Sequence, residues 1–337
     1  MKKVFLWIIF LGVIGWAAYM AFFQDTYRTS VRAATDFEIE DTSSVGKIVI
    51  ADRAGRVITV ERGRGEDWIL NGQYPARTDA VDVLLTTFRN IYVQRPVSKN
   101  AQEEVNRVMA ADSKKVDIYD RDGKRIKTWY VGHPTIDNKG TYMLLETPRG
   151  GRAAEPYVMD LKGFIGVLNT RFFTDLNEWR SVILLEYPDM DLEEITVEYP
   201  AEPDSSFRIT YGGGNDISLY RAGSNRPVSA FDTTLVKDYM LNFKMLAFEN
   251  FRTGLTEAQE DSVRATMPYQ IIRIKDREKD HRIVLWPKSD PHPPLDAEGF
   301  VPDGERIYAS MDDGELALAQ RYVWDKFGAT IRAFNPR

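Results

Sequence analysis

The sequence predicts an α+β protein in which one N-terminal transmembrane helix is followed by two tandem repeats, each an antiparallel sheet with helices on one face. Three observations support this prediction. Residues 4–23 form an uncharged apolar run, strand-like alternating segments stand beside segments with a helical period, and the second half repeats the element order of the first. The expected domains are residues 1–29 (transmembrane anchor and stalk), 30–188 (first α+β repeat) and 189–337 (second α+β repeat).

The N-terminal segment has the length and composition of a membrane span. Residues 4–23, at about 1.5 Å each, cover roughly the 30 Å of bilayer hydrocarbon. Lys2 and Lys3 precede this run and Trp7 and Trp16 lie in it, so these four are the expected membrane-anchor residues. Because basic flanks stay cytoplasmic, we expect an inner-membrane protein with its N-terminus inside and a periplasmic ectodomain. A cleaved signal peptide is the alternative, although the run exceeds the usual core of about 7–15 residues.

The composition excludes several classes of function. The 337 residues include 44 Lys and Arg against 50 Asp and Glu, for a net charge of −6, and no run of basic residues suggests a nucleic-acid interface. The absence of cysteine excludes disulfides, thiolate metal sites and cysteine nucleophiles. We therefore expect no cofactor, no metal and no nucleic-acid partner.

The elements of the first repeat follow in order from period and turn chemistry. Alternation predicts strands at 47–51, 57–61 and 68–70, a helical period predicts a helix at 78–91, and a second helix is expected at 100–111 behind an Asn100–Glu103 cap. A hairpin follows, with strands at 116–120 and 125–131 around the turn 121–123.

The second repeat shows the same order. Strands are expected at 195–199, 207–211 and 217–220, a helix at 233–243, a helix opened by a Thr256–Gln259 cap, and a hairpin from 269–276 and 282–286. An offset of 156 aligns the two halves up to the hairpin turn, and one inserted residue then aligns Trp129 with Trp286. The longest irregular stretch is 288–304, which is expected to be a functional or mobile loop.

Several short motifs carry a family resemblance; they are Trp68-Ile69-Leu70, Tyr74-Pro75-Ala76-Arg77 before Asp79-Ala80-Val81, and Asn177-Glu178-Trp179-Arg180 before Ile183 and Leu184. Together with the apolar N-terminus, they resemble a bacterial domain-of-unknown-function family over roughly residues 1–225. Members of that family are membrane-anchored and accompany ABC-type transporter components, including those linked to gliding motility. The resemblance implies an accessory envelope protein near a transporter, and it carries over no catalytic residue.

Residues able to perform chemistry are sparse in this sequence. The three histidines are His133, His281 and His292, and no two have the spacing of a metal or catalytic pair. His281 is expected to be a solvated turn residue, whereas His133 and His292, each next to proline, are the candidate ligand contacts. No Gly-x-Ser-x-Gly or His-Glu-x-x-His motif occurs, so the sequence predicts no catalytic residue.

These observations favour a non-enzymatic, membrane-anchored accessory or scaffold protein of an ABC-transporter-type envelope complex, with a protein partner and the membrane as its contacts. Two alternatives stay open. One is a periplasmic module that binds a peptide or glycan in a pocket between the repeats, near His133 and the Pro-rich loop 288–304. The other is an envelope hydrolase, which requires His133 or His292 within hydrogen-bonding distance of a serine or carboxylate.

Overall fold

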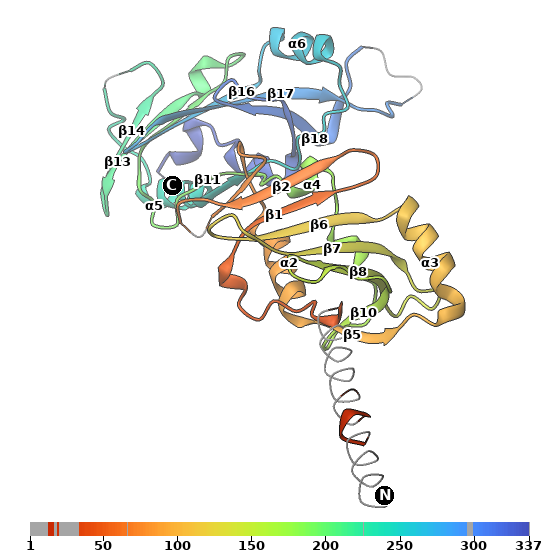
Figure 1. Cartoon of the computed structure of the whole chain (residues 1–337). Helices are drawn as coiled ribbons and strands as arrows, with labels where there is room; N and C mark the ends of the chain where they lie inside the picture. The colour runs from red at the N-terminus through yellow and green to blue at the C-terminus, as the bar shows by residue number, and fades with distance from the viewer. Residues whose placement is uncertain are drawn as a thin grey trace, which may run out of the picture. The chain divides into compact units, whose positions relative to one another are not determined.

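The computed structural model describes residues 13–16, 19, 34–65, 67–224, 226–294 and 299–336. The chain divides into two compact units, Met1–Ser181 (unit 1) and Val182–Arg337 (unit 2) (Figure 1). Each unit has its own sheet and its own hydrophobic core.

The predicted α+β class is wrong. The described residues are mostly β structure, in three antiparallel sheets of ten, two and seven strands, with few helices. Among them, no helix is long and apolar enough to cross a membrane. The predicted span 4–23 lies outside the described residues except at 13–16 and 19, and so do Lys2, Lys3 and Trp7. Trp16 is described and is exposed.

The unit 1 sheet has the order β4-β3-β2-β1-β6-β7-β8-β10-β5, and β9 pairs with β8. Its strands are β1 (Val45–Ala51), β2 (Val57–Arg62), β3 (Trp68–Leu70), β4 (Tyr74–Pro75), β5 (Ile91–Pro96), β6 (Lys114–Asp120), β7 (Arg125–Pro134), β8 (Thr141–Thr147), β9 (Gly151–Arg152) and β10 (Tyr157–Leu161). The helical elements are η1 (Thr42–Ser44), α2 (Thr78–Asn90), α3 (Lys99–Ala111), η2 (Asn169–Arg171) and α4 (Leu176–Trp179).

Helices cover both faces of the unit 1 sheet, because both faces carry apolar side chains. Successive residues of a strand point to opposite faces. In β7, Trp129 packs edge-on against Phe88 of α2, with ring centroids 5.0 Å apart. Its neighbour Tyr130 packs on a smaller cluster that contains Met109 of α3. The predicted arrangement, with helices on one face only, is therefore wrong.

The unit 2 sheet has the order β14-β13-β12-β16-β17-β18-β19, and a separate pair consists of β11 and β15. The strands are β11 (Ile183–Glu186), β12 (Leu192–Glu198), β13 (Phe207–Gly213), β14 (Asp216–Arg221), β15 (Met245–Ala247), β16 (Gln270–Asp276), β17 (Asp280–Ser289), β18 (Pro302–Met311) and β19 (Ala317–Gln320). The helical elements are η3 (Pro203–Ser205), α5 (Thr233–Met240), η4 (Leu241–Lys244), α6 (Glu257–Ala265), α7 (Arg321–Trp324), η5 (Asp325–Phe327) and η6 (Ile331–Phe334).

The two predicted helix caps have different outcomes. The capping box of α6 is confirmed, since the Thr256 side chain and the Gln259 side chain each bond the backbone of the other residue. The cap predicted at Asn100 is wrong, because α3 begins one residue earlier, at Lys99, and its N-cap residue Ser98 makes no side-chain cap bond. In α3, packing of the apolar face therefore stabilises the helix without a side-chain cap.

The two sheets share one strand order. In each unit a three-stranded meander pairs through its first strand with a hairpin, and a further strand follows the hairpin. The registers agree at this junction, since Ile48 faces Ile118 in unit 1 and Ile195 faces Ile274 in unit 2.

The alignment of Trp129 with Trp286 is wrong. Trp129 lies opposite Val116, and the position of Val116 corresponds to Ile272, which faces Ile283. Trp286 instead lies on the other face of its sheet, in the small cluster covered by α6. The sequence alignment places one extra residue in the second hairpin. In the structure the first hairpin is the longer one, because it contains a β-bulge and a longer turn.

Candidate functional site

The two predicted ligand-contact histidines lie in different units. His133 is on β7, where its ring centroid is 4.9 Å from that of Tyr142 and its buried Nδ1 has no hydrogen-bond partner among the described residues. His292 follows β17 and is exposed, and its backbone N–H donates to Asp290 Oδ1 at 2.8 Å. Within the part of the chain that the structure describes, neither imidazole bonds a serine or a carboxylate side chain.

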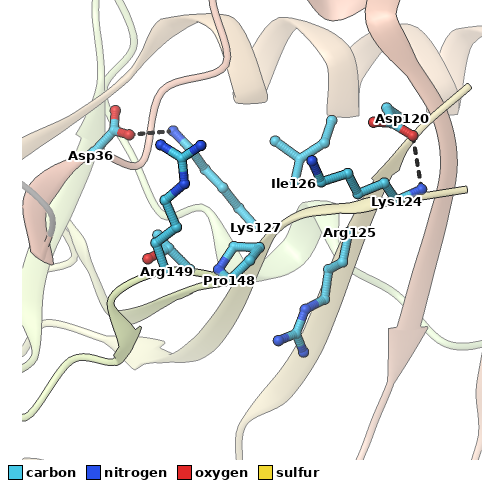
Figure 2. A pocket seen from close by; sticks show the side chains of 9 residues that line it. Asp36, Asp120, Lys124, Arg125, Ile126, Lys127, Pro148 and Arg149 are labelled. Atoms are coloured by element: carbon cyan, nitrogen blue, oxygen red, sulfur yellow. Dashed lines mark hydrogen bonds and ion pairs between the residues drawn. The ribbon is translucent and has the colours of Figure 1, made fainter. Parts of the chain in front are cut away.

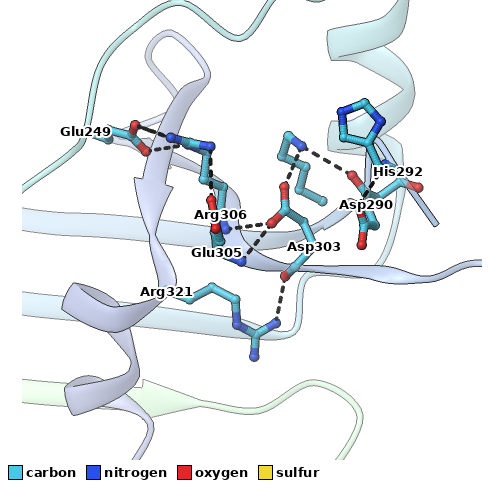
Figure 3. Close-up of polar contacts among 9 residues, drawn as sticks. Glu249, Asp290, His292, Asp303, Glu305, Arg306 and Arg321 are labelled. Carbon is cyan, nitrogen blue, oxygen red and sulfur yellow. Dashed lines mark hydrogen bonds and ion pairs between the residues drawn. The ribbon is translucent and has the colours of Figure 1, made fainter. Parts of the chain in front are cut away.

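Buried charges hold the base of the loop that carries His292 (Figure 3). Lys288 Nζ lies 2.7 Å from Asp303 Oδ2, with side chains only 15% and 8% exposed. Burial alone would raise the pKa of Asp303, but the Lys288 bond and two backbone N–H donors lower it to about 2. Nearby, Arg306 holds Glu249 through two nitrogens at 2.9 and 3.0 Å. The role of this network is structural, since each of these charges is paired.

The third histidine is not the solvated turn residue that the sequence predicts. The His281 side chain is mostly buried at the start of β17, and its Nδ1 lies 3.0 Å from Asp312 Oδ2. Lys279 Nζ donates to the same carboxylate oxygen at 2.8 Å. Beside it, Tyr187 donates its hydroxyl to Asp276 at 2.8 Å, and burial together with this carboxylate raises the pKa of Tyr187. The His281 imidazole is therefore surrounded by carboxylates that already have hydrogen-bond partners.

The corresponding end of the unit 1 sheet contains an open cavity of about 390 Å³, here called the basic pocket (Figure 2). Its lining residues come from the turn and strand of the β6–β7 hairpin, the end of β8 and the segment before β1. They are Asp36, Asp120, Lys124, Arg125, Ile126, Lys127, Thr147, Pro148 and Arg149. Four lining residues are cationic and two are anionic, so the lining has a formal charge of 4 − 2 = +2.

Lys127 is the fixed cation of the basic pocket. Its side chain is only 10% exposed, and its Nζ lies 3.1 Å from Asp36 Oδ2 and donates to the Glu38 carbonyl at 2.6 Å. Figure 2 shows the Arg149 side chain extending toward this pair, and the Lys124 side chain lying beside Ile126. The Lys124 and Arg149 side chains thus line the same cavity as the fixed Lys127 ammonium.

Local hydrogen bonds set the shape of the two turns that border the basic pocket. Asp120 Oδ1 accepts the backbone N–H groups of Asp122 and Lys124 at 3.0 and 2.8 Å, which closes the hairpin turn. In the other turn, Thr147 Oγ1 accepts the Gly150 N–H at 3.0 Å. Because its oxygen is the acceptor, the Thr147 hydroxyl hydrogen stays available to donate toward a ligand.

The basic pocket is not among the sites that the sequence predicts. The available signal was Lys124, Arg125 and Lys127 within four consecutive positions of a hairpin strand. The β-bulge in this hairpin places Lys127 opposite Ile118, on the main-core face, and Arg125 on the other face, where it forms an ion pair with Glu146 at 3.0 Å. Asp36 and Arg149 are distant in sequence and join the pocket only through the fold.

A second feature of unit 1 is a pair of apolar loops, here called the apolar tips, formed by Ile136, Phe164 and Ile165. Ile136 is 101% exposed in the β7–β8 turn, and Ile165 is 91% exposed in the loop after β10. Both loops belong to the same end of the sheet, since Thr141 pairs with β10 and its hydroxyl oxygen accepts the Leu168 N–H at 2.8 Å.

The comparisons assign this chain to a family. Residues 68–266, more than half of the chain, match the family described as a domain of unknown function (DUF4340), and the chain belongs to that family. The match begins at β3 and ends just after α6, so it includes segments of both units. The predicted domain-of-unknown-function family is thus confirmed, while the matched span extends beyond residue 225, where the resemblance ended. Curated proteins and solved structures give no match to this chain.

Proposed function

We propose that this chain is a non-enzymatic accessory or scaffold protein of an ABC-transporter-type envelope complex, which docks on a partner protein through the apolar tips. In this proposal both folded units lie on the extracytoplasmic side of the inner membrane, and contact with transporter subunits holds the protein there. The transporter context comes from the family resemblance, and the docking role is supported by the exposure of Ile136 and Ile165.

The apolar tips have the properties of a docking surface. Isolated exposed apolar residues are common on proteins, and the docking role is inferred here from two nearly fully exposed isoleucines in loops at one end of the sheet. Burying one isoleucine fully is worth about 1.5–3 kcal/mol, so the two together could contribute about 3–6 kcal/mol to binding. The Thr135 N–H bond to the Gly140 carbonyl at 2.9 Å holds the Ile136 turn in place, which limits the entropy that docking costs.

The test is affinity purification from gently solubilised cells of the full chain and of the double variant Ile136→Asp/Ile165→Asp. We expect the unaltered chain to recover a transporter subunit and the double variant to lose it. Val57→Asp is the matched control, because Val57 is also an exposed aliphatic residue of unit 1 outside the tips. Recovery of the same partner by the double variant, or of no envelope partner by any chain, would refute the proposal.

The predicted hydrolase alternative has no supporting geometry at His133 or His292 and is not proposed. A ligand-binding function has one specific observation in its favour, the basic pocket.

A further inference from the structure

We propose that the basic pocket of unit 1 binds the phosphate group of a phosphorylated small molecule or lipid headgroup. This site is separate from the docking role of the apolar tips, and either proposal can fail without the other.

The pocket is a built site rather than a surface with scattered lysines. Lys127 is nine-tenths buried and is held by Asp36 and by the Glu38 carbonyl, so its ammonium is fixed before a ligand arrives. A cation held in this way loses little conformational entropy on binding. Since Asp36 is itself 61% exposed, water screens its attraction for Lys127, and the pocket can still hold an anion.

Further donors surround the held cation. The ammonium of Lys124, the guanidinium of Arg149 and the hydroxyl of Thr147 belong to two different turns that border the same cavity (Figure 2). Among the described residues, neither the Lys124 ammonium nor the Arg149 guanidinium has an ion-pair partner. These groups can therefore close on an anion without first breaking an internal bond.

The number of donors and the charge favour phosphate over carboxylate. A carboxylate presents two oxygens in one plane, whereas a phosphate presents three acceptor oxygens and about −1.5 to −2 charges at pH 7. Arg125 is paired with Glu146, so the cations that remain for a ligand are Lys124, Lys127 and Arg149 against Asp36 and Asp120, a formal charge of 3 − 2 = +1 that favours an anion. An arginine fork beside a lysine point charge is a common combination for recognising phosphate.

The size of the cavity indicates that the phosphate is part of a larger molecule. About 390 Å³ lies within the range of small-molecule sites and exceeds what a single phosphate fills. Ile126 and Pro148 add apolar surface to the lining, which suits the carbon part of a phosphate ester.

Unit 2 shows that the strand order alone does not make this pocket. The position of Lys127, opposite Ile118, corresponds to His281, opposite Ile274. There, the Asp312 carboxylate already accepts from Lys279 and contacts His281. The anion site is thus a property of unit 1, and one site per chain is expected.

The experiment is calorimetric titration of the full chain in detergent with glycerol 3-phosphate, inorganic phosphate and acetate, together with flotation on phosphatidic acid and phosphatidylcholine vesicles. The test variant is Lys124→Ala/Arg149→Ala. Its matched control is Arg53→Ala/Arg64→Ala, which removes two exposed cations of unit 1 outside the pocket. Because vesicles can bind the chain elsewhere, only the difference between these two variants counts in flotation.

We expect saturable binding of a phosphate probe at one site per chain, weakened at least about tenfold by the test variant, unchanged in the control and reduced by added salt. Specific binding of glycerol 3-phosphate supports a free phosphate ester, and a pocket-dependent preference for phosphatidic acid supports a lipid headgroup. Acetate binding equal to phosphate binding would overturn the assignment, as would saturation by no phosphate probe below about 10 mM.

Discussion

Replacing Asp303 by asparagine tests how much the buried ion pair at the base of the Pro-rich loop stabilises unit 2. Asparagine keeps an oxygen that can accept the backbone N–H groups of Glu305 and Arg306, which Asp303 Oδ1 now accepts at 2.7 and 3.0 Å. What changes is the other oxygen, which lies 2.7 Å from Lys288 Nζ. In the variant an uncharged amide faces a largely buried ammonium.

The magnitude follows from the burial of both partners. Removing one partner of a buried pair leaves an uncompensated charge and costs about 3–5 kcal/mol. Lys288 is 15% exposed and can recover some hydration, so we expect the lower end, about 3 kcal/mol. In Asp303→Asn/Lys288→Met the buried charge is gone as well, and the double variant should be more stable than Asp303→Asn alone.

The assay is urea denaturation at pH 7, followed by tryptophan fluorescence, with the transition of unit 2 fitted separately because a chain with two units need not unfold in one step. A matched control is Asp313→Asn, which removes one partner of the exposed Arg282 pair and should cost less than about 1 kcal/mol. A loss below 1 kcal/mol for Asp303→Asn, or strictly additive effects in the double variant, would refute the reasoning.

Three further predictions concern the cores and the pH response. Trp129→Ala should destabilise unit 1 by about 3–5 kcal/mol in urea denaturation, because the indole is fully buried; a loss under 1 kcal/mol would contradict its place in the core. Gly46→Ala should cost about 1–3 kcal/mol by calorimetry, since its Cβ would lie 2.6 Å from the Arg121 Cα, whereas Gly65→Ala, which meets open space, should be near neutral. Asp303 has a lowered pKa of about 2, so its contribution to stability is full above its unfolded value near 4 and is lost as pH falls from about 4 to about 2. Near-ultraviolet circular dichroism should show that this acid sensitivity is smaller in Asp303→Asn.

Segments with a clean period could be predicted from the sequence. The helical period at 78–91 matches α2, and the Thr256–Gln259 pair forms the capping box of α6. The missed strands lack alternation for a physical reason. In β8, Met143 and Leu145 pack on the main core while Leu144 between them packs on the opposite cluster, so the run is apolar throughout. These missed strands account for the wrong class, because they turn small sheets into sheets of ten and seven strands.

The candidate sites were harder to predict than the elements. The sequence favours the histidines as candidate contacts, because only three imidazoles are present. The basic pocket depends instead on Lys127, and only the fold shows that this side chain is buried beside Asp36. The apolar tips depend on exposure, and a sequence cannot show that Ile136 points to solvent while equally apolar neighbours lie inside. Both features depend on contacts between segments that are distant in the chain.

The most direct test of the proposed docking role is photo-crosslinking in living cells, with a benzophenone amino acid placed at position 136 of the full chain. The account predicts a defined crosslink to a transporter subunit from position 136 and none from the control position 57. A chain that crosslinks at position 136 only to itself or to nothing, or that gives the same product from both positions, would contradict it.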